Sequence, residues 1–267
     1  MASIGAFLRS LVVGPTAEKP GETAGDDAVP IKLPDARVIY AIGDIHGRHD
    51  CLQRLIARIQ EDVEKGGQTD AALVFLGDYV DRGDDSRDVI AYCAEIGRYW
   101  SHEAVFLRGN HEDAMLTFLK DPVGGAAWLR FGGLSTLMSY GVPNVAETMP
   151  PEKLKAASSI LGQQLPHEHL RFLESTSLTH QEGNLFFCHA GVDPSCEPGA
   201  QSTRTLMWGE GTASPPDSWG AVVIHGHDVV ETPLVRSREI NVDTGAYYSG
   251  RLTAVRLQSG MMSFLQT

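Results

Sequence analysis

The sequence predicts an α/β fold in which two packed, mixed sheets are flanked by helices, and two observations lead to this prediction. Before Ala114, short apolar runs alternate with amphipathic helical patterns, which is typical of parallel strands with helices on the faces of a sheet. After Phe172, short strand candidates follow one another with close turns, which indicates a second sheet. With 267 residues, 42% of them hydrophobic, the chain is long enough to bury such a core in one large domain.

The first half of the chain contains three strand–helix units. The apolar run Val38–Ile42 predicts a strand, and apolar residues spaced by three and four from Leu52 to Ile59 predict the helix after it. The run Leu73–Leu76 is typical of a strand buried on both faces. The next expected elements are a helix at Ser86–Arg98, a strand at Ala104–Leu107 and a helix that starts near His111.

The second half begins with a region of different texture. From about residue 114 to residue 172 the pattern is helical but is interrupted by Gly and Pro, so we expect a helical insertion that walls one side of a site. The later strands are expected at Leu178–Thr179, Leu185–Cys188, Ala221–Ile224, Glu239–Val242, Leu252–Leu257 and Met262–Leu265.

The N-terminal residues are expected to lie outside the folded domain. We expect residues 1–34 to form a flexible arm and linker. Residues 14–34 are rich in Pro, Gly, Ala and acidic residues and show no hydrophobic period. The apolar run Ile4–Val13 has neither a preceding basic residue nor a clear cleavage site, so we interpret it as a frayed or docking segment. A weak membrane-surface role of this run is the alternative. The folded domain is expected over residues 35–267.

Composition narrows the possible partners and the compartment. The net charge of −12 argues against non-specific nucleic-acid binding, although bound divalent cations would still allow a phosphorylated substrate. No apolar stretch approaches the roughly 20 residues of a membrane span. The four cysteines show no paired spacing, which predicts free thiols in a reducing compartment and hence a cytoplasmic protein.

Three sequence blocks share one design, an apolar strand followed by Gly and polar side chains. They read Gly43-Asp44-Ile45-His46-Gly47, Gly77-Asp78-Tyr79-Val80-Asp81-Arg82-Gly83 and Gly109-Asn110-His111-Glu112. Open α/β sheets bind ligands at the carboxyl ends of their strands, so these side chains are expected to share one site. Two carboxylates and a guanidinium in one tight turn are costly without a compensating ion or ligand.

The side chains after the strands have the chemistry of metal ligands. The mixture of carboxylate, imidazole and amide suits Mn²⁺, Fe or Zn²⁺ and is too rich in nitrogen for a Ca²⁺ site. Asp78 stands in the middle block and is the natural bridge between two ions. The candidate metal ligands are Asp44, His46, Asp78, Asn110, His189 and His225.

The three blocks resemble the signature of the metallophosphoesterases, the calcineurin-like phosphoesterase superfamily. Within it they are most similar to the PPP-type serine/threonine protein phosphatases, and the bacterial and phage members look closest. The resemblance extends to His189-Ala190-Gly191, His225-Gly226-His227 and Asn241-Val242-Asp243-Thr244-Gly245, so it covers the chain from about Val38 to Leu257. It implies a four-layer αββα fold with two divalent metal ions, Mn first and Fe or Zn as alternatives, at the strand ends.

The resemblance also implies a role for each side chain. Asp44, His46 and Asp78 would hold the first metal ion, and Asp78, Asn110, His189 and His225 the second. A hydroxide that bridges the two ions would attack phosphorus directly and in line. His111 would be the general acid, Asp81 would orient it, and Arg82 would hold the phosphate through a bidentate contact.

One departure from the resemblance concerns substrate binding. Many bacterial relatives carry Trp-Ile-Arg-Glu after the His-Ala-Gly block, whereas this sequence reads Met207-Trp208-Gly209-Glu210. A second phosphate-binding arginine is therefore missing there, and Arg204 and Arg251 are the candidates to replace it. Arg108 is expected to be a buried structural residue.

The leading expectation is a metal-dependent phosphomonoester hydrolase that acts on phosphoserine and phosphothreonine in proteins. Symmetrical dinucleoside tetraphosphatases usually carry Gln where this chain has His46, and residues 122–166 hold only three basic residues, so we rank a hydrolase of diadenosine tetraphosphate or of another small molecule second. A catalytically silent module that binds phosphorylated partners is the alternative of another class. The expected partner is thus a phosphorylated protein or small substrate, with no nucleic acid and no membrane span, and the oligomeric state stays open.

Overall fold

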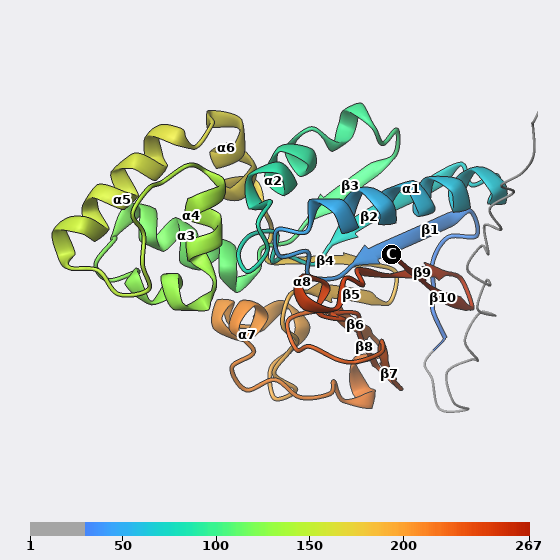
Figure 1. Ribbon diagram of the computed structural model, residues 1–267. Coiled ribbons are helices and arrows are strands. Elements are labelled where there is room, and N and C mark those ends of the chain that lie inside the picture. The colour runs from blue at the N-terminus through green and yellow to red at the C-terminus, as the bar shows by residue number, and fades with distance from the viewer. Residues whose placement is uncertain (1–29) are drawn as a thin grey trace, which may run out of the picture.

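The computed structural model describes residues 30–267 (Figure 1). The expected apolar segment at Ile4–Val13 and most of the expected arm lie outside the described residues. Residues 30–34 had been assigned to the linker, but they pack against the domain: Leu33 is buried, and the Lys32 amide donates to Asn184 Oδ1 at 2.7 Å. The packed chain therefore begins before the expected boundary at residue 35, because Ile31 and Leu33 contribute to the core.

Two five-stranded mixed sheets form the centre of the molecule, as the sequence predicted. The first sheet contains, in spatial order, β10 (Met261–Gln266), β9 (Thr253–Gln258), β1 (Arg37–Ile42), β2 (Asp70–Phe75) and β3 (Glu103–Phe106). The second contains β4 (Thr179–Glu182), β5 (Leu185–Cys188), β6 (Val222–His225), β8 (Glu239–Asn241) and β7 (Leu234–Arg236). The triplets β1–β2–β3 and β5–β6–β8 are parallel, and the other pairs are antiparallel.

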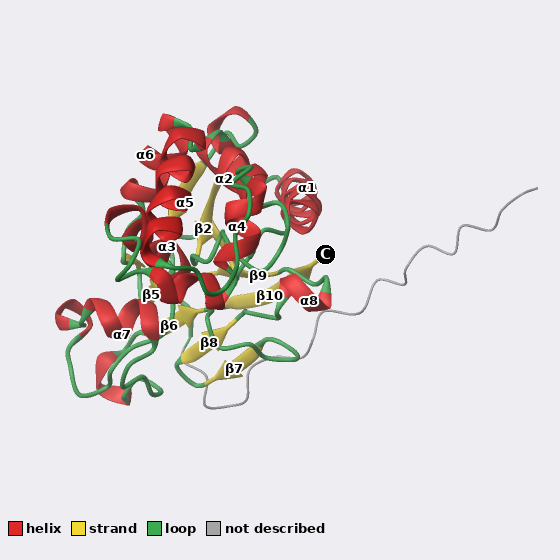
Figure 2. Cartoon of the chain, turned by 60° about the vertical axis from the view of Figure 1, so that its left-hand side comes forward, coloured by secondary structure: helices red, strands yellow, loops and turns green. Residues whose placement is uncertain are grey.

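Helices cover the outer faces of the two sheets (Figures 1 and 2). They are α1 (His49–Gly66), α2 (Ser86–Ala94), α3 (Asn110–Lys120), α4 (Gly133–Ser139), α5 (Pro151–Gln164), α6 (His167–Ser175), α7 (Thr203–Trp208) and α8 (Ala246–Ser249). A 3-10 helix, η2 (Ala126–Phe131), connects α3 to α4. The helices from α3 to α6 group at one end of the molecule, beside the carboxyl ends of β1 and β2 (Figure 1).

Alternation along the strands divides the core between the two faces of each sheet. In β1, Tyr40 and Ile42 face the helices, whereas Ile39 and Ala41 face the second sheet. In β6, Ile224 faces the first sheet, whereas Val223 packs toward α7 on the outside. This period of two is what a strand with two buried faces requires, and it gives the four αββα layers.

A few elements differ from the expectations. The helix expected at Ser86–Arg98 ends at Ala94 and continues as a 3-10 turn, and the three-residue strand β7 was not expected because it is too short to show a pattern. All four cysteines are unpaired. In the part of the chain that the structure describes, no helix is both long and apolar enough to span a membrane.

Candidate functional site

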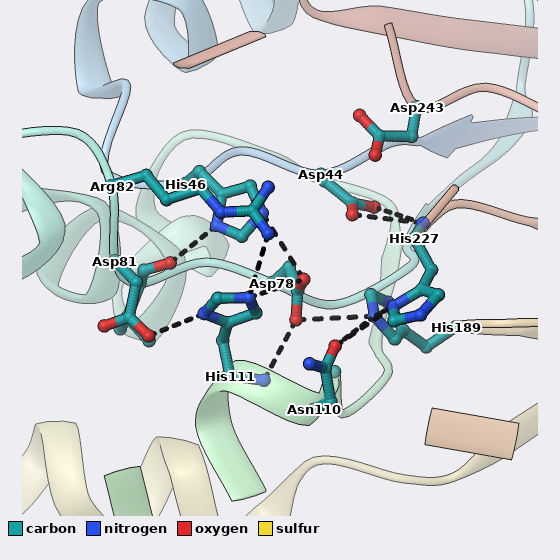
Figure 3. A network of polar contacts seen from close by, with 12 residues as sticks. Asp44, His46, Asp78, Asp81, Arg82, Asn110, His111, His189, His227 and Asp243 are labelled. Carbon is teal, nitrogen blue, oxygen red and sulfur yellow. Dashed lines mark hydrogen bonds and ion pairs between the residues drawn. The ribbon is translucent and has the colours of Figure 1, made fainter. Parts of the chain in front are cut away.

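The design that the three sequence blocks share has a simple geometric result. The parallel strands β1, β2 and β3 end side by side, so the loops after them meet at one edge of the first sheet. The parallel strands β5 and β6 of the second sheet bring two further histidines, His189 and His227, to the same place (Figure 3). The structure thus gathers polar groups from five strand ends around Asp78.

Asp78 lies at the centre of the cluster and is held in a strained conformation. Its φ is 54°, in the left-handed region that residues other than Gly rarely adopt. The Glu112 carboxylate holds the loop by accepting hydrogen bonds from the amides of Asp78 (2.9 Å), Tyr79 (2.8 Å) and Gly109 (3.0 Å). Gly109 is required at its position, because a Cβ there would lie 2.0 Å from Asp78 Oδ1.

On one side of Asp78, four acceptor-capable atoms converge. His189 donates its Nδ1 proton to the Leu76 carbonyl (2.9 Å), which leaves Nε2 to face Asn110 Oδ1 at 3.0 Å and Asp78 Oδ1 at 3.4 Å. His227 Nδ1 lies 3.2 Å from both His189 Nε2 and Asn110 Oδ1. Burial lowers the pKa of His189, but the Asp78 carboxylate outweighs burial and raises it. The cluster therefore attracts a cation, either a proton or a metal ion.

His225, which was expected in this group, lies outside it, and His227 lies there instead. His225 is the last residue of β6, and the alternation of the strand puts it on the outer face with Val223. There its Nε2 lies 3.2 Å from Glu239 Oε1, and its Nδ1 donates to the Gly226 carbonyl at 3.0 Å. The turn after β6 has φ 66° at His227, which returns that side chain to the cluster. Burial and the neighbouring His189 lower the pKa of His227 to about 4, so the ring is neutral at pH 7.

On the other side of Asp78, His46 has the tautomer that a metal ligand needs. Its Nδ1 donates to the Val80 carbonyl at 2.8 Å, and burial lowers the pKa of the ring well below its ordinary value. Its Nε2 is buried, has no hydrogen-bond partner and lies 3.4 Å from Asp78 Oδ2. A buried nitrogen without a partner is costly unless something fills the space before it, so the donors here fit a divalent cation.

Asp44, also expected as a ligand, lies at the margin of the cluster. Its carboxylate is buried and accepts the His227 amide proton at 3.1 Å. Burial, together with the charges of Asp243 and Asp78, raises the pKa of Asp44 well above its ordinary value. Three carboxylates so close together in a buried place also call for a cation.

His111 forms a separate arm of the site, together with Asp81 and Arg82. Its Nδ1 donates to Asp81 Oδ2 at 2.6 Å, and its Nε2 lies 3.3 Å from Arg82 Nη2 and 3.8 Å from Asp78 Oδ2. Burial lowers the pKa of His111, but Asp78 and Asp81 outweigh burial and raise it to about 9. The guanidinium beside Nε2 makes this nitrogen a poor metal ligand, and the raised pKa keeps a proton on the ring at neutral pH.

Asp81 is held in place by groups that the sequence did not reveal. Thr136 Oγ1 donates to Asp81 Oδ1 at 2.6 Å, and Trp128 Nε1 donates to Asp81 Oδ2 at 2.7 Å. Both come from the helical region that we expected only to wall the site. No local signal identifies them, because neither lies in a motif and both reach Asp81 across a long stretch of chain. Glu112 caps the start of its own helix through the Gly109 amide and also fixes the loop after β2.

Arg82 is the arginine at the mouth of the site. Its guanidinium lies 4.7 Å from the ring centre of Tyr247, and its φ is 68°. The two proposed replacements for a second arginine point elsewhere: Arg204 pairs with Glu210 at 2.5 Å, and Arg251 donates to the Glu231 carbonyl at 2.8 Å. Arg108, expected to be a buried structural residue, is partly buried and donates to Thr176 Oγ1 at 2.9 Å.

Known proteins are similar to the chain over most of its length. The calcineurin-like phosphoesterase family matches residues 37–248. The chain is 27% identical over 236 residues to the asymmetrical bis(5′-nucleosyl)-tetraphosphatase PrpE of Bacillus velezensis, covering 80% of this chain and 87% of that protein. It is 28% identical to PrpE of Bacillus thuringiensis, covering 80% and 88%.

Solved structures share the fold at lower identity. A crystal structure provisionally named a diadenosine tetraphosphatase has a TM-score of 0.58 and 20% identity, covering 90% of this chain and 98% of that one. The cold-active protein-tyrosine phosphatase of a Shewanella species has a TM-score of 0.51 and 18% identity, covering 91% and 85%. The family match spans most of the chain and contains every strand-end block of the cluster. The chain belongs to the calcineurin-like phosphoesterase family.

Proposed function

We propose that the chain hydrolyses dinucleoside tetraphosphates asymmetrically, into a nucleoside triphosphate and a nucleoside monophosphate. The observation that carries hydrolysis is the His111–Asp81 pair, a proton-bearing imidazole beside the acceptor cluster of Asp78. Substrate choice is supported by the PrpE relatives, which the chain matches over four-fifths of its length. This reverses our sequence-based ranking, in which a phosphoprotein substrate came first, because that preference finds no support among these relatives.

The residues of the cluster fit the binding of divalent metal ions. The proposed ligands are Asp44, His46, Asp78, Asn110, His189 and His227, of which Asp78 faces both groups of donors. When bound, such ions would neutralise phosphate charge and supply an activated water.

The remaining steps belong to the His111 arm. Arg82 would bind the non-bridging oxygens of the phosphate under attack, since a guanidinium matches two phosphate oxygens at once. The His111 imidazolium would give its Nε2 proton to the oxygen of the departing nucleotide. Asp81 holds His111 by Nδ1, stabilises the charged ring and keeps Nε2 directed into the site.

A phosphorylated serine or threonine in a protein is the second candidate substrate. It is favoured by the Asp81-Arg82-Gly83 block, which resembles that of the PPP-type phosphatases. A catalytically silent binding module is disfavoured, because both groups of donors and the His111–Asp81 pair are present.

The test is product analysis with Mn²⁺-loaded protein on diadenosine tetraphosphate and, in parallel, on a phosphothreonine peptide. The proposal expects ATP and AMP in equal amounts and slower release of phosphate from the peptide. Formation of two ADP molecules, or turnover of the peptide alone, would contradict it. An Asp78→Asn protein, in which both donor groups lose their shared carboxylate, controls for contaminating activity.

A further inference from the structure

Two aromatic rings, Phe131 and Trp208, meet at one border of the site. Phe131 ends η2, and Trp208 ends α7. Their ring centres lie 6.4 Å apart, and their planes are inclined by 68°, so the rings form a corner. Phe131 remains 48% exposed, so one side of the pair is open to solvent and can accept a further flat group.

Each ring is attached to a residue that touches the phosphate-binding part of the site. Phe131 precedes Gly132, whose carbonyl accepts the Arg82 amide proton at 3.3 Å. Trp208 precedes Gly209, where a Cβ would lie 3.5 Å from His227 Nε2. The corner therefore lies next to both Arg82 and the His189–His227 group.

The charges at the corner suit a base and not a phosphate. Asp113 Oδ2 lies 3.4 Å from Trp208 Nε1, so a carboxylate borders the two rings. Arg204, on the same helix as Trp208, has its guanidinium paired with Glu210. A carboxylate repels phosphate, but its oxygens accept hydrogen bonds from the exocyclic amino group of a purine.

We propose that Phe131 and Trp208 form a stacking site for one purine base of the substrate, while the phosphate chain lies across Asp78 and Arg82. The inference deepens the proposed function and rests on it for the substrate class. Every base has a π-face, and stacking on an aromatic ring tolerates different bases. This corner would bind the nucleoside end of the substrate, while Arg82 binds its phosphate chain.

The test is equilibrium binding, measured by calorimetry with Mn²⁺ present, of two ligands that resist hydrolysis. α,β-Methylene-ADP carries a nucleoside, and methylenediphosphonate has the same P–CH2–P chain without the nucleoside. The wild-type protein is expected to bind the nucleotide more tightly. Phe131→Ala and Trp208→Ala should each weaken nucleotide binding by about fivefold to a hundredfold and leave methylenediphosphonate binding unchanged.

Three further variants make the result specific. Phe131→Tyr keeps a ring and should restore nucleotide affinity, whereas Phe131→Leu keeps an apolar side chain and should not. Tyr99→Ala removes an equally exposed ring, stacked on Tyr92 near the opposite end of β3, and should change neither ligand. Thermal unfolding of each variant identifies any that fails to fold, and Phe131, being half exposed, is the safer position.

Equal binding of the two ligands to the wild-type protein would overturn the inference, and so would a loss that affects both ligands alike in Phe131→Ala. Failure of the proposed function has a different signature. If diadenosine tetraphosphate is not hydrolysed but the nucleotide still binds through Phe131, the base site stands and the reaction assigned to it is wrong.

Discussion

The residues on the two sides of Asp78 are of the same kinds but differ in their protonation. One side is the group of His189 and His227, and the other is the arm formed by His111, Asp81 and Arg82. Toward His189 and His227, nitrogen and oxygen atoms that can all act as acceptors lie 3.0–3.4 Å apart. Toward His111, the chain itself supplies a carboxylate for the ring proton, since Nδ1 lies 2.6 Å from Asp81 Oδ2. The first arrangement requires a cation from outside, and in the second the His111 ring is itself the cation.

This difference assigns separate tasks to neighbouring histidines. A histidine whose free nitrogen faces only acceptors is suited to bind a metal ion, whereas one held between a carboxylate and a guanidinium is suited to carry a proton. Residue type alone does not distinguish them, since His46 and His111 both lie close to Asp78 Oδ2. The groups around Nε2 determine whether each histidine binds a metal ion or carries a proton.

The largest expected effect on activity comes from removing the proton that the His111 ring donates. His111→Asn should lower kcat by about a hundredfold to ten-thousandfold on phosphate esters with poor leaving groups. The loss should be much smaller for p-nitrophenyl phosphate, because its leaving group needs little protonation. A series of phosphate esters of rising leaving-group pKa measures this, and an equal loss across the series would remove His111 from the role of acid.

The next effect separates the two histidines at the end of β6. His227→Ala should weaken Mn²⁺ binding by at least about tenfold, because it removes a donor from the cluster. His225→Ala should weaken it less, because the His225 ring points toward Glu239. Metal titration of the two proteins side by side checks this. Greater sensitivity at position 225 would restore the assignment made from the sequence.

The hydrogen bonds between Thr136 and Asp81 should stabilise the folded protein. Thr136→Val leaves both the buried carboxylate and the Asp81 amide with one partner fewer, which should lower the free energy of unfolding by about 1–3 kcal/mol. Ser135→Ala in the same helix is the matched control, because Ser135 donates only to the nearby Gly132 carbonyl at a partly exposed place. Urea unfolding of both variants gives the comparison, and equal losses would contradict this role.

The smallest effect concerns the His225–Glu239 pair, which lies outside the cluster around Asp78. The hydrogen bond from His225 lowers the pKa of Glu239 to about 2, below its ordinary value of 4.5. The stabilisation is therefore complete above pH 4.5 and is lost as the pH falls toward 2. Glu239→Gln should cost about 1 kcal/mol at pH 7, since solvent screens part of the interaction. In urea unfolding, the gap from the wild-type protein should shrink by pH 3, and a gap that grows there would be evidence against the pairing.

The sequence predicted the parts of the site that are local. The blocks after β1, β2 and β3 each combine a strand, a tight turn and the functional side chain within a few residues, so the pattern alone locates Asp78 and His111. His227 was missed for a local reason: ending β6 at Ile224, one residue early, hides the fact that His225 belongs to the strand and points outward. Because side chains alternate along a strand, an error of one residue in the strand end assigns a side chain to the wrong face of the sheet.

The partners of Asp81 were missed for a different reason. Thr136 and Trp128 come from an irregular helical region and reach Asp81 only after the chain folds. Packing of this kind leaves no periodic pattern, because the donor and the acceptor belong to separate elements. The packed segment at residues 30–34 was hidden likewise, since its apolar residues stand between prolines.

We expect the histidines around Asp78 to divide into metal ligands and one proton carrier, His111. Calorimetric titration of Mn²⁺ into the wild-type and His111→Asn proteins tests this division most directly. If His111 carries a proton and binds no metal ion, both proteins should bind Mn²⁺ with the same number of sites and the same affinity. Loss of a site, or a large loss of affinity, in His111→Asn would mean that His46, Asp78 and His111 bind a metal ion together, and would contradict this account.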